Sequence, residues 1–372
     1  MPRDNVSSVP SSKNKRSYSI SRRNKIVRVL ATVVMVIYSL ITLLPFYFLF
    51  IRSFVPTKES GDLHLWIPKT EEVSLDAEVG NLGVFYNLDT KILKDALGIP
   101  QDEFLMARTS LRQLSENYDI SEEEIKGFFK DFYTYNGWKT LLTGNLYGTS
   151  FWGALARSLL VTAVSLFLLI LLSLFTGFGL GGLHRRDQRV VYGIYLLQMV
   201  IPAMLILLPQ RQLIQLVYNL IPGYADEITT RYTLQLLSIV LINSKGTALS
   251  VMILTAAIGA IPKELEDSAS IDGATRWQYL WKIVVPLLKV PIVSLIVIQL
   301  PYYYNLFLEP YVYLDPANST LLPYIQSAVG QFSTNFQVIY SAVFASLVPI
   351  VIVYLLFRRF FIEGAMEGAI KG

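Results

Sequence analysis

Few residues in this chain have the types and spacing that chemistry requires. The stretch GFGLGG at residues 177–182 matches the G-x-G-x-x-G pattern of dinucleotide sites. It follows an apolar segment instead of a strand, so we interpret its glycines as a surface for close helix packing. The sequence has no cysteine, no P-loop pattern and only two histidines, His64 and His184. We therefore expect no thiol chemistry, no P-loop binding of ATP and no metal site, and we assign no catalytic residue and no cofactor.

Composition indicates a membrane protein. Hydrophobic residues make up 53% of the 372 residues and charged residues only 16%, whereas soluble domains carry about 25% charged residues. The basic residues border apolar segments and form no basic face, so we expect no nucleic-acid partner.

Polar side chains inside apolar segments are the next candidates, because they are costly in lipid and tend to line a bundle interior or a water-filled path. For Tyr302, Tyr303 and Tyr304 we favour a belt at the level of the lipid headgroups over contact with a sugar, and keep Tyr303 as a path candidate. The candidates for lining such a path are Gln198, Gln210, Asn243, Gln299, Tyr303 and Asn305.

Six segments have the length of about 20 apolar residues that a membrane-spanning helix needs. The third is expected to break near Pro202 and Pro209, and the first is interpreted as a retained span in preference to a cleaved signal peptide. The fold class is thus an all-α polytopic membrane protein with six transmembrane helices. The expected spans are residues 26–51, 152–180, 190–220, 234–260, 284–308 and 338–357.

Lysine and arginine predict the orientation. They concentrate in the tail of residues 1–25, in the second and fourth connections, and in the C-terminal tail of residues 358–372. Six spans place these four regions on one side, which the positive-inside rule makes the cytoplasm. The residues are Lys13, Lys15, Arg16, Arg22, Arg23, Lys25, Arg185, Arg186, Arg189, Lys263, Arg276, Lys282, Arg358, Arg359 and Lys371.

The first connection, residues 52–151, is a long polar insert that this topology places outside the cytoplasm. Residues 89–99 and 121–135 are expected to form short amphipathic helices, and Ser121 and Glu124 have the spacing of a capping box. A small helical domain and a decorated loop without a core of its own remain equal alternatives.

The stretch EDSASIDGATRWQYLWKIVVP, residues 266–286, is a polar interruption between two apolar segments. We expect a short helix with Pro262 in its first turn and Gly273 after its end. A second helix should begin near Thr275, with Trp277, Trp281, Val284 and Leu288 forming one apolar stripe. The first helix has too few large apolar residues to anchor in lipid, so we favour a groove on a protein partner over a position on the headgroups.

This stretch resembles the EAA loop of permeases in type I ABC importers. The matching positions are Asp267-Ser268-Ala269, Gly273, Ile283 and Val285-Pro286, and the flanking IDGA is similar to the carbohydrate branch. The ending with Gly368, Lys371 and Gly372 resembles the tail of MalG-type subunits of oligosaccharide importers, and GQFSTNF at residues 330–336 is also similar. The likeness covers the permease core, residues 152–357, and the first span.

The resemblance implies a non-enzymatic, pore-forming permease subunit of an ATP-driven importer that moves a carbohydrate into the cytoplasm of a bacterium or archaeon. Its partners would be a second, MalF-like permease, two cytoplasmic ABC ATPase subunits, an extracytoplasmic solute-binding protein, the carbohydrate and membrane lipid. The coupling loop, residues 262–286, would contact an ATPase through Glu264, Asp267, Ser268, Ala269, Gly273 and Pro286, and the tail through Gly368, Lys371 and Gly372.

Two other functions remain open. An ion-coupled secondary transporter would require inverted repeats and discontinuous helices around a midplane site. A non-transporting membrane scaffold would use the insert as a receptor domain.

Overall fold

The structure is a computed structural model that describes residues 22–57, 61–67, 73–86, 90–146, 148–181, 185–245, 247–329 and 335–370. It divides into two units, residues Met1–Phe48 and Leu49–Gly372. Each unit is described by itself.

The first unit consists of most of helix α1 (Arg22–Arg52). The hydroxyls of Thr32, Ser39 and Thr42 each donate to the carbonyl four residues earlier, at 2.8–2.9 Å. These bonds satisfy the hydroxyls within the helix, as a lipid environment requires. Residues Val27–Arg52 are long and apolar enough to cross a membrane, close to the predicted span.

Two further straight helices in the second unit can cross a membrane, namely α6 (Phe151–Gly181) and α17 (Phe336–Ile370) over its part Phe336–Arg358. Three bent helix pairs pass the same criteria of length and composition. They are α7 (Arg185–Val200) with α8 (Ala203–Tyr218), α9 (Ile228–Ser244) with α10 (Ala248–Gly259), and Arg276–Leu287 with α14 (Lys289–Tyr304). With each pair as one span, the described residues contain six spans, as predicted.

The bends have local causes. Pro202 is the N-cap of α8 and separates it from α7 with an angle of 91° between them, as predicted. The predicted break at Pro209 is wrong, because this proline lies inside α8. The break of 53° between α9 and α10 lies at residues 245–247 and was not predicted from the sequence.

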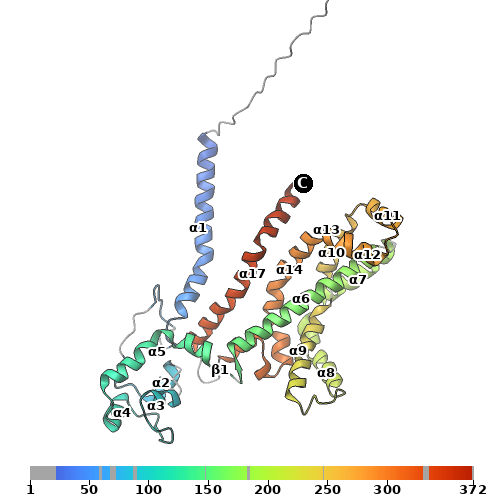
Figure 1. The fold of residues 1–372 in the computed structure, drawn as a ribbon. Coiled ribbons are helices and arrows are strands. Elements are labelled where there is room, and N and C mark those ends of the chain that lie inside the picture. Colours follow the sequence, from blue (N-terminus) through green and yellow to red (C-terminus); the bar gives the residue numbers. More distant parts are fainter. Residues whose placement is uncertain are drawn as a thin grey trace, which may run out of the picture. The chain divides into compact units, whose positions relative to one another are not determined.

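Helix α6 is the centre of the bundle, since it packs against α9, α10 and α14 (Figure 1). Gly177 of α6 faces α10, and a Cβ atom on it would lie 3.1 Å from Thr255 Oγ1 and 3.2 Å from the Thr255 nitrogen. The glycine therefore permits close packing of the two helices, and its place within α6 excludes the strand-turn-helix of a dinucleotide site.

Short elements connect α14 to α17. They are α15 (Leu308–Tyr313), the 3-10 turn η3 (Pro316–Asn318) and α16 (Leu321–Ser327). The amide of Gln235 in α9 holds this segment, because its Oε1 accepts bonds from the Asp315 N–H at 3.2 Å and from Asn318 Nδ2 at 3.3 Å.

The described residues of the insert form four helices and a pair of short strands. The helices are α2 (Val79–Tyr86), α3 (Thr90–Ala96), α4 (Leu111–Tyr118) and α5 (Glu122–Thr143). Strands β1 (Asn145–Leu146) and β2 (Thr149–Ser150) pair antiparallel, with Asn145 opposite Ser150. Helix α3 is shorter than the expected 89–99, and α5 extends eight residues beyond the expected 121–135.

The insert has a hydrophobic core of its own, which favours the domain interpretation over the decorated loop. The core unites the segment before α2 with α2, α3, α4 and the first half of α5. Its buried members are Val73, Leu75, Val79, Leu82, Leu93, Leu97, Ile99, Leu111, Leu114, Ile120, Ile125 and Phe129.

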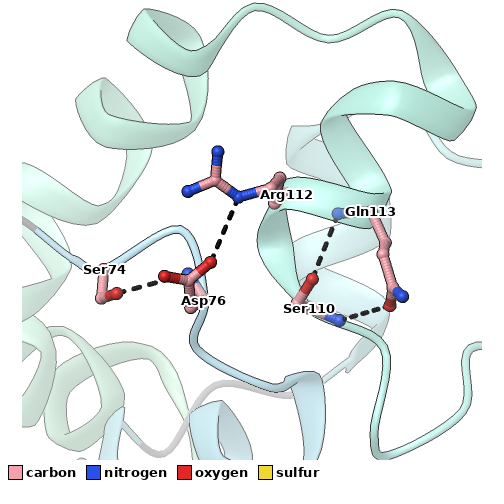
Figure 2. Close-up of polar contacts among 5 residues, drawn as sticks. All are labelled: Ser74, Asp76, Ser110, Arg112 and Gln113. Carbon is pink, nitrogen blue, oxygen red and sulfur yellow. Dashed lines mark hydrogen bonds and ion pairs between the residues drawn. The ribbon is translucent and has the colours of Figure 1, made fainter.

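Polar caps hold the helices of the insert in place. Figure 2 shows a reciprocal capping box at α4, in which Ser110 Oγ accepts from the Gln113 N–H at 3.2 Å and Gln113 Oε1 accepts from the Ser110 N–H at 3.0 Å. The Arg112 side chain joins Asp76 at 3.1 Å. Ser121 Oγ accepts from the Glu124 N–H at 3.2 Å at the start of α5, which is one of the two bonds of the capping box predicted from the spacing.

We predict that Phe129→Ala destabilises the insert by about 3–5 kcal/mol, because the ring is fully buried and its removal leaves a cavity. Limited proteolysis of the full chain in lipid nanodiscs should then cut within residues 73–129 faster. The matched control is Phe104→Ala, whose ring is 86% exposed; its cleavage should equal that of the unaltered chain. Equal cleavage of both variants would contradict a separate core.

Candidate functional site

A cavity of about 620 Å3 lies among α7, α8, α9, α10 and α14. It brings together five of the six residues of the candidate path: Gln198, Gln210, Asn243, Gln299 and Tyr303. Asn305 differs, since it is the exposed C-cap of α14 and does not line this cavity. Amide and hydroxyl groups can donate and accept hydrogen bonds, which is the chemistry that a polar solute requires.

The three consecutive tyrosines lie in different surroundings. Tyr303 is only 2% exposed, and its hydroxyl donates to the Asn243 carbonyl oxygen at 2.8 Å. The Tyr304 hydroxyl donates to the carbonyl oxygen of Ser346 in α17 at 2.9 Å. The belt interpretation is therefore wrong for these two residues, whereas Tyr302 is exposed and lines the cavity.

The break between α9 and α10 forms one wall of the cavity. Thr247 begins α10 with a capping box to Ser250, and Gln299 Nε2 donates to Thr247 Oγ1 at 3.3 Å. Asn243 turns its amide back to the Ile239 carbonyl oxygen at 3.0 Å. Backbone groups freed by the break thus lie beside polar side chains and a hollow, where non-helical backbone is tolerated in a membrane.

Sequence reasoning missed several lining residues, namely Lys245, Thr247 and Glu309. A signal for the first two exists, since Ser-Lys-Gly-Thr interrupts the apolar run of residues 234–260. Glu309 lies beyond the fifth expected span. It lines the cavity because α15, which contains it, packs beside α8.

Tyr313 in α15 fixes the amide of Gln210. Its hydroxyl bonds to the Leu207 carbonyl oxygen at 3.0 Å and to Gln210 Oε1 at 3.2 Å. Burial raises the pKa of Tyr313 to about 12; the Glu309 carboxylate adds to the rise and Arg211 opposes it. The bond from the Tyr313 hydroxyl to Gln210 Oε1 sets the orientation of the Gln210 side-chain amide at the edge of the cavity.

The coupling loop folds as two short helices around Gly273. Helix α11 (Lys263–Ile271) begins after Pro262, which is its N-cap and not part of its first turn. Gly273 has a φ of +75°, the left-handed conformation that glycine adopts without steric cost. Helix α12 (Arg276–Tyr279) begins after Thr275, as predicted, with a capping box to Gln278.

The exposed face of α11 carries acidic and polar side chains, whereas its buried face packs against the membrane helices. Glu264, Asp267 and Ser268 are exposed, and Ile271 is 87% exposed although it is large and apolar. Ala269 is only 7% exposed and belongs to the core that joins the loop to α6, α10 and α14. The small side chain of Ala269 thus allows close packing within the chain. Ala269 is not part of the exposed surface of α11 that a partner could contact.

A π-helical segment (Leu280–Val284) and helix α13 (Val285–Leu287) follow α12. The expected stripe is not on one face: Val284 and Leu288 are buried, while Trp277 remains 60% exposed and lies 5.8 Å from the Phe175 ring. Tyr279 and Leu280 are buried and face inward instead. Pro286, the last residue of the motif, is exposed within α13.

Helix α17 carries the chain into the C-terminal tail, and Gly368 lies within it. Lys371 and Gly372 are outside the described residues, as are the basic residues before Arg22 and most of the GQFSTNF stretch.

Residues 170–362, more than half of the chain, match the family model of the binding-protein-dependent transport system inner membrane component. The chain belongs to this family. It is accordingly a multi-pass membrane permease, and the matched segment includes the coupling loop and all the residues that line the cavity.

Individual permeases show the same likeness. The arabinooligosaccharides transport system permease AraQ of Bacillus subtilis (strain 168) is 24% identical over 269 residues, which are 72% of this chain and 87% of AraQ. The probable permease AmyC for starch degradation products, from Thermoanaerobacterium thermosulfurigenes, is 24% identical over 220 residues, 59% of this chain and 75% of AmyC.

A solved structure shows the same fold. It belongs to a bacterial ABC transporter involved in the import of the acidic polysaccharide alginate, and matches with a TM-score of 0.58 and 17% identity. The match covers 92% of this chain and 98% of the other.

We predict that Gln210→Leu lowers transport by this permease about tenfold, because it removes a polar group from the cavity and leaves the buried Tyr313 hydroxyl without one acceptor. Gln212→Leu is the matched control, since Gln212 is exposed on the same helix and does not line the cavity. Uptake of labelled solute into proteoliposomes measures both. Equal uptake by the two variants would remove Gln210 from the path.

Proposed function

We propose that this permease is one of two membrane subunits of an ATP-driven importer that moves a carbohydrate into the cytoplasm. The observation that carries the proposal is the cavity, in which amides and tyrosines from several spans of a family member converge. Such groups match the many hydroxyls of a sugar by hydrogen bonds and offer ring faces for its apolar side. The oligosaccharide permeases among its relatives support this substrate class.

The importer would comprise this chain, a second MalF-like permease, two cytoplasmic ABC ATPase subunits and an extracytoplasmic solute-binding protein. The exposed face of α11 supports the ATPase contact, because it combines the carboxylates of Glu264 and Asp267 with the exposed side chain of Ile271. Apolar contact would provide affinity, and the carboxylates would select a basic rim.

Transmission of the ATPase movement would use the packing of the loop. Ala269, Leu280 and Val284 share one core with Leu174 of α6, Leu254 of α10 and Leu295 of α14. Packed helices of this kind move as rigid bodies between discrete arrangements. A displacement of α11 would therefore reach α10 and α14, which both line the cavity, and would alternate its access.

In this proposal the chain lies in the plasma membrane of a bacterium or archaeon with both termini in the cytoplasm, and the insert lies on the opposite side. The coupling loop and Gly368 would then share the side of the ATPases. The tail of Gly368, Lys371 and Gly372 would extend toward the ATPase dimer.

Family membership favours this importer over the two other functions open from the sequence. The described residues of this family member contain bent spans. Discontinuous helices therefore do not by themselves indicate an ion-coupled transporter. Purification of the tagged chain from its native membrane should retain a P-loop ATPase. A chain that purifies without one and transports without ATP would refute the proposal.

We predict that Asp267→Lys abolishes transport and the stimulation of ATP hydrolysis by the binding protein. Lysine at this position would place a positive charge against the proposed basic rim, and a like-charge contact across an interface costs several kcal/mol. Membrane insertion should be unchanged, because Asp267 is exposed. Uptake and ATPase assays of the reconstituted complex measure the effect, and undiminished stimulation would exclude α11 as the coupling helix.

Backbone conformation provides a second test of the loop. Gly273→Val should lower stimulated ATP hydrolysis, because a branched residue is strained at a φ of +75°. Gly273→Asn is the matched control, since asparagine adopts the left-handed conformation more readily. There is open space around the Gly273 Cβ position, so a difference between the variants would report conformation and not collision.

A further inference from the structure

Among the described residues, the most extensive contact between the insert and the membrane bundle is a joint formed by α5 and the first turns of α17 (Figure 1); α5 and β2 make smaller contacts with α6. The Gly137 N–H of α5 donates to Oε1 of Gln337 in α17 at 3.1 Å. A Cβ atom on Gly137 would lie 2.5 Å from Gln337 Cγ and 2.9 Å from the Gln337 carbonyl carbon. Only glycine allows the helices to approach this closely without a shift of the backbone.

The residues that follow α1 complete the joint. Trp138 Nε1 donates to Ser53 Oγ at 3.1 Å, and Ser341 Oγ of α17 donates to the Ser53 carbonyl oxygen at 3.2 Å. Ser53 and Ser341 are completely buried. The Trp138 ring also lies 6.0 Å from Phe54 and 6.2 Å from Phe344. The joint thus combines buried hydrogen bonds with aromatic packing, which makes relative rotation of α5 and α17 costly.

The joint is connected to the cavity through α14. Leu141 near the end of α5 shares a core with Tyr304 of α14 and Ala342 of α17. The Tyr304 hydroxyl bonds to the Ser346 carbonyl oxygen of α17 at 2.9 Å. The neighbouring Tyr303 and Gln299 line the cavity. A continuous series of packed groups therefore leads from the insert to the cavity wall.

We propose that the insert regulates the transport step, because α5 and α17 move as one rigid body and carry displacements of the insert to the cavity. A solute-binding protein that displaces the insert would then favour one state of the cavity in addition to delivering solute. This inference rests on the proposed function, since it requires a transport cycle with such a partner.

Gly137→Ala tests the joint in the complete reconstituted complex. The added methyl group must separate α5 from Gln337, so we expect stimulation of ATP hydrolysis by the binding protein to fall about five- to tenfold, within the usual range of allosteric coupling. Basal hydrolysis and the affinity for the binding protein should be unchanged. The matched control is Gly127→Ala in the same helix, which meets open space and should behave as wild type.

Gln337→Ala covers the case in which Gly137→Ala does not assemble, because it removes the acceptor of the Gly137 bond without adding atoms. We expect a smaller loss of stimulation, about two- to fivefold. Wild-type stimulation in both variants would overturn the regulatory role. A wild-type complex without stimulated transport would instead overturn the proposed function, so the two failures are distinguishable.

Whether α5 and α17 move as one rigid body can be measured directly with spin labels. The chain contains no cysteine, so introduced cysteines can be labelled selectively. Spin labels at Glu123→Cys in α5 and Leu355→Cys in α17, both exposed, report the distance across the joint. We expect this distance to change by less than about 2 Å between the resting and the vanadate-trapped complex. A larger change would show that α5 and α17 move separately and would overturn the proposal.

Discussion

Polar groups inside an apolar surrounding must find partners within the chain, and most of the architecture follows from this constraint. An unpaired backbone group in hydrocarbon costs several kcal/mol, so a span can break only where other groups or a hollow receive the freed amides and carbonyls. The break between α9 and α10 satisfies it with the Thr247 capping box and the Gln299 amide. The buried hydroxyls of Tyr303 and Tyr304 satisfy it by bonding to carbonyls of neighbouring segments.

Because buried polar groups are paired between helices, groups of helices in the bundle can move together as rigid bodies. Helix α6 approaches α10 closely at Gly177, and the core around Ala269 and Leu280 attaches the coupling loop to both. The joint of Gly137 and Gln337 does the same on the side of the insert. Each contact joins whole helices through small residues or buried bonds, which resist gradual deformation.

The features that could be predicted from the sequence depend on local properties. Hydropathy predicts the six spans, and a glycine between two polar helices predicts the turn at Gly273. Polar residues in apolar segments predicted five of the side chains that line the cavity. Features that depend on tertiary packing could not be predicted in this way. Whether Pro209 breaks a helix, whether Tyr304 faces lipid and whether Glu309 returns to the cavity are decided by neighbours distant in the chain. The π-helical segment before Pro286 belongs to the same group, since its wider turn is stabilised by the burial of Leu280 and Val284.

The break in the cavity wall has an electrostatic consequence. The C-terminal end of α9 carries a partial negative charge and the N-terminal end of α10 a partial positive charge, each about half an elementary charge. Only three residues separate these two helix ends. Their electric fields therefore cancel at a distance, but close to the break a negative region lies beside a positive one. A hydroxyl group both donates and accepts a hydrogen bond and is matched to such an alternating surface, whereas an ion meets attraction from one end and repulsion from the other. The discontinuous helix thereby places a hydrogen-bond acceptor end and a hydrogen-bond donor end next to each other in the wall of the cavity.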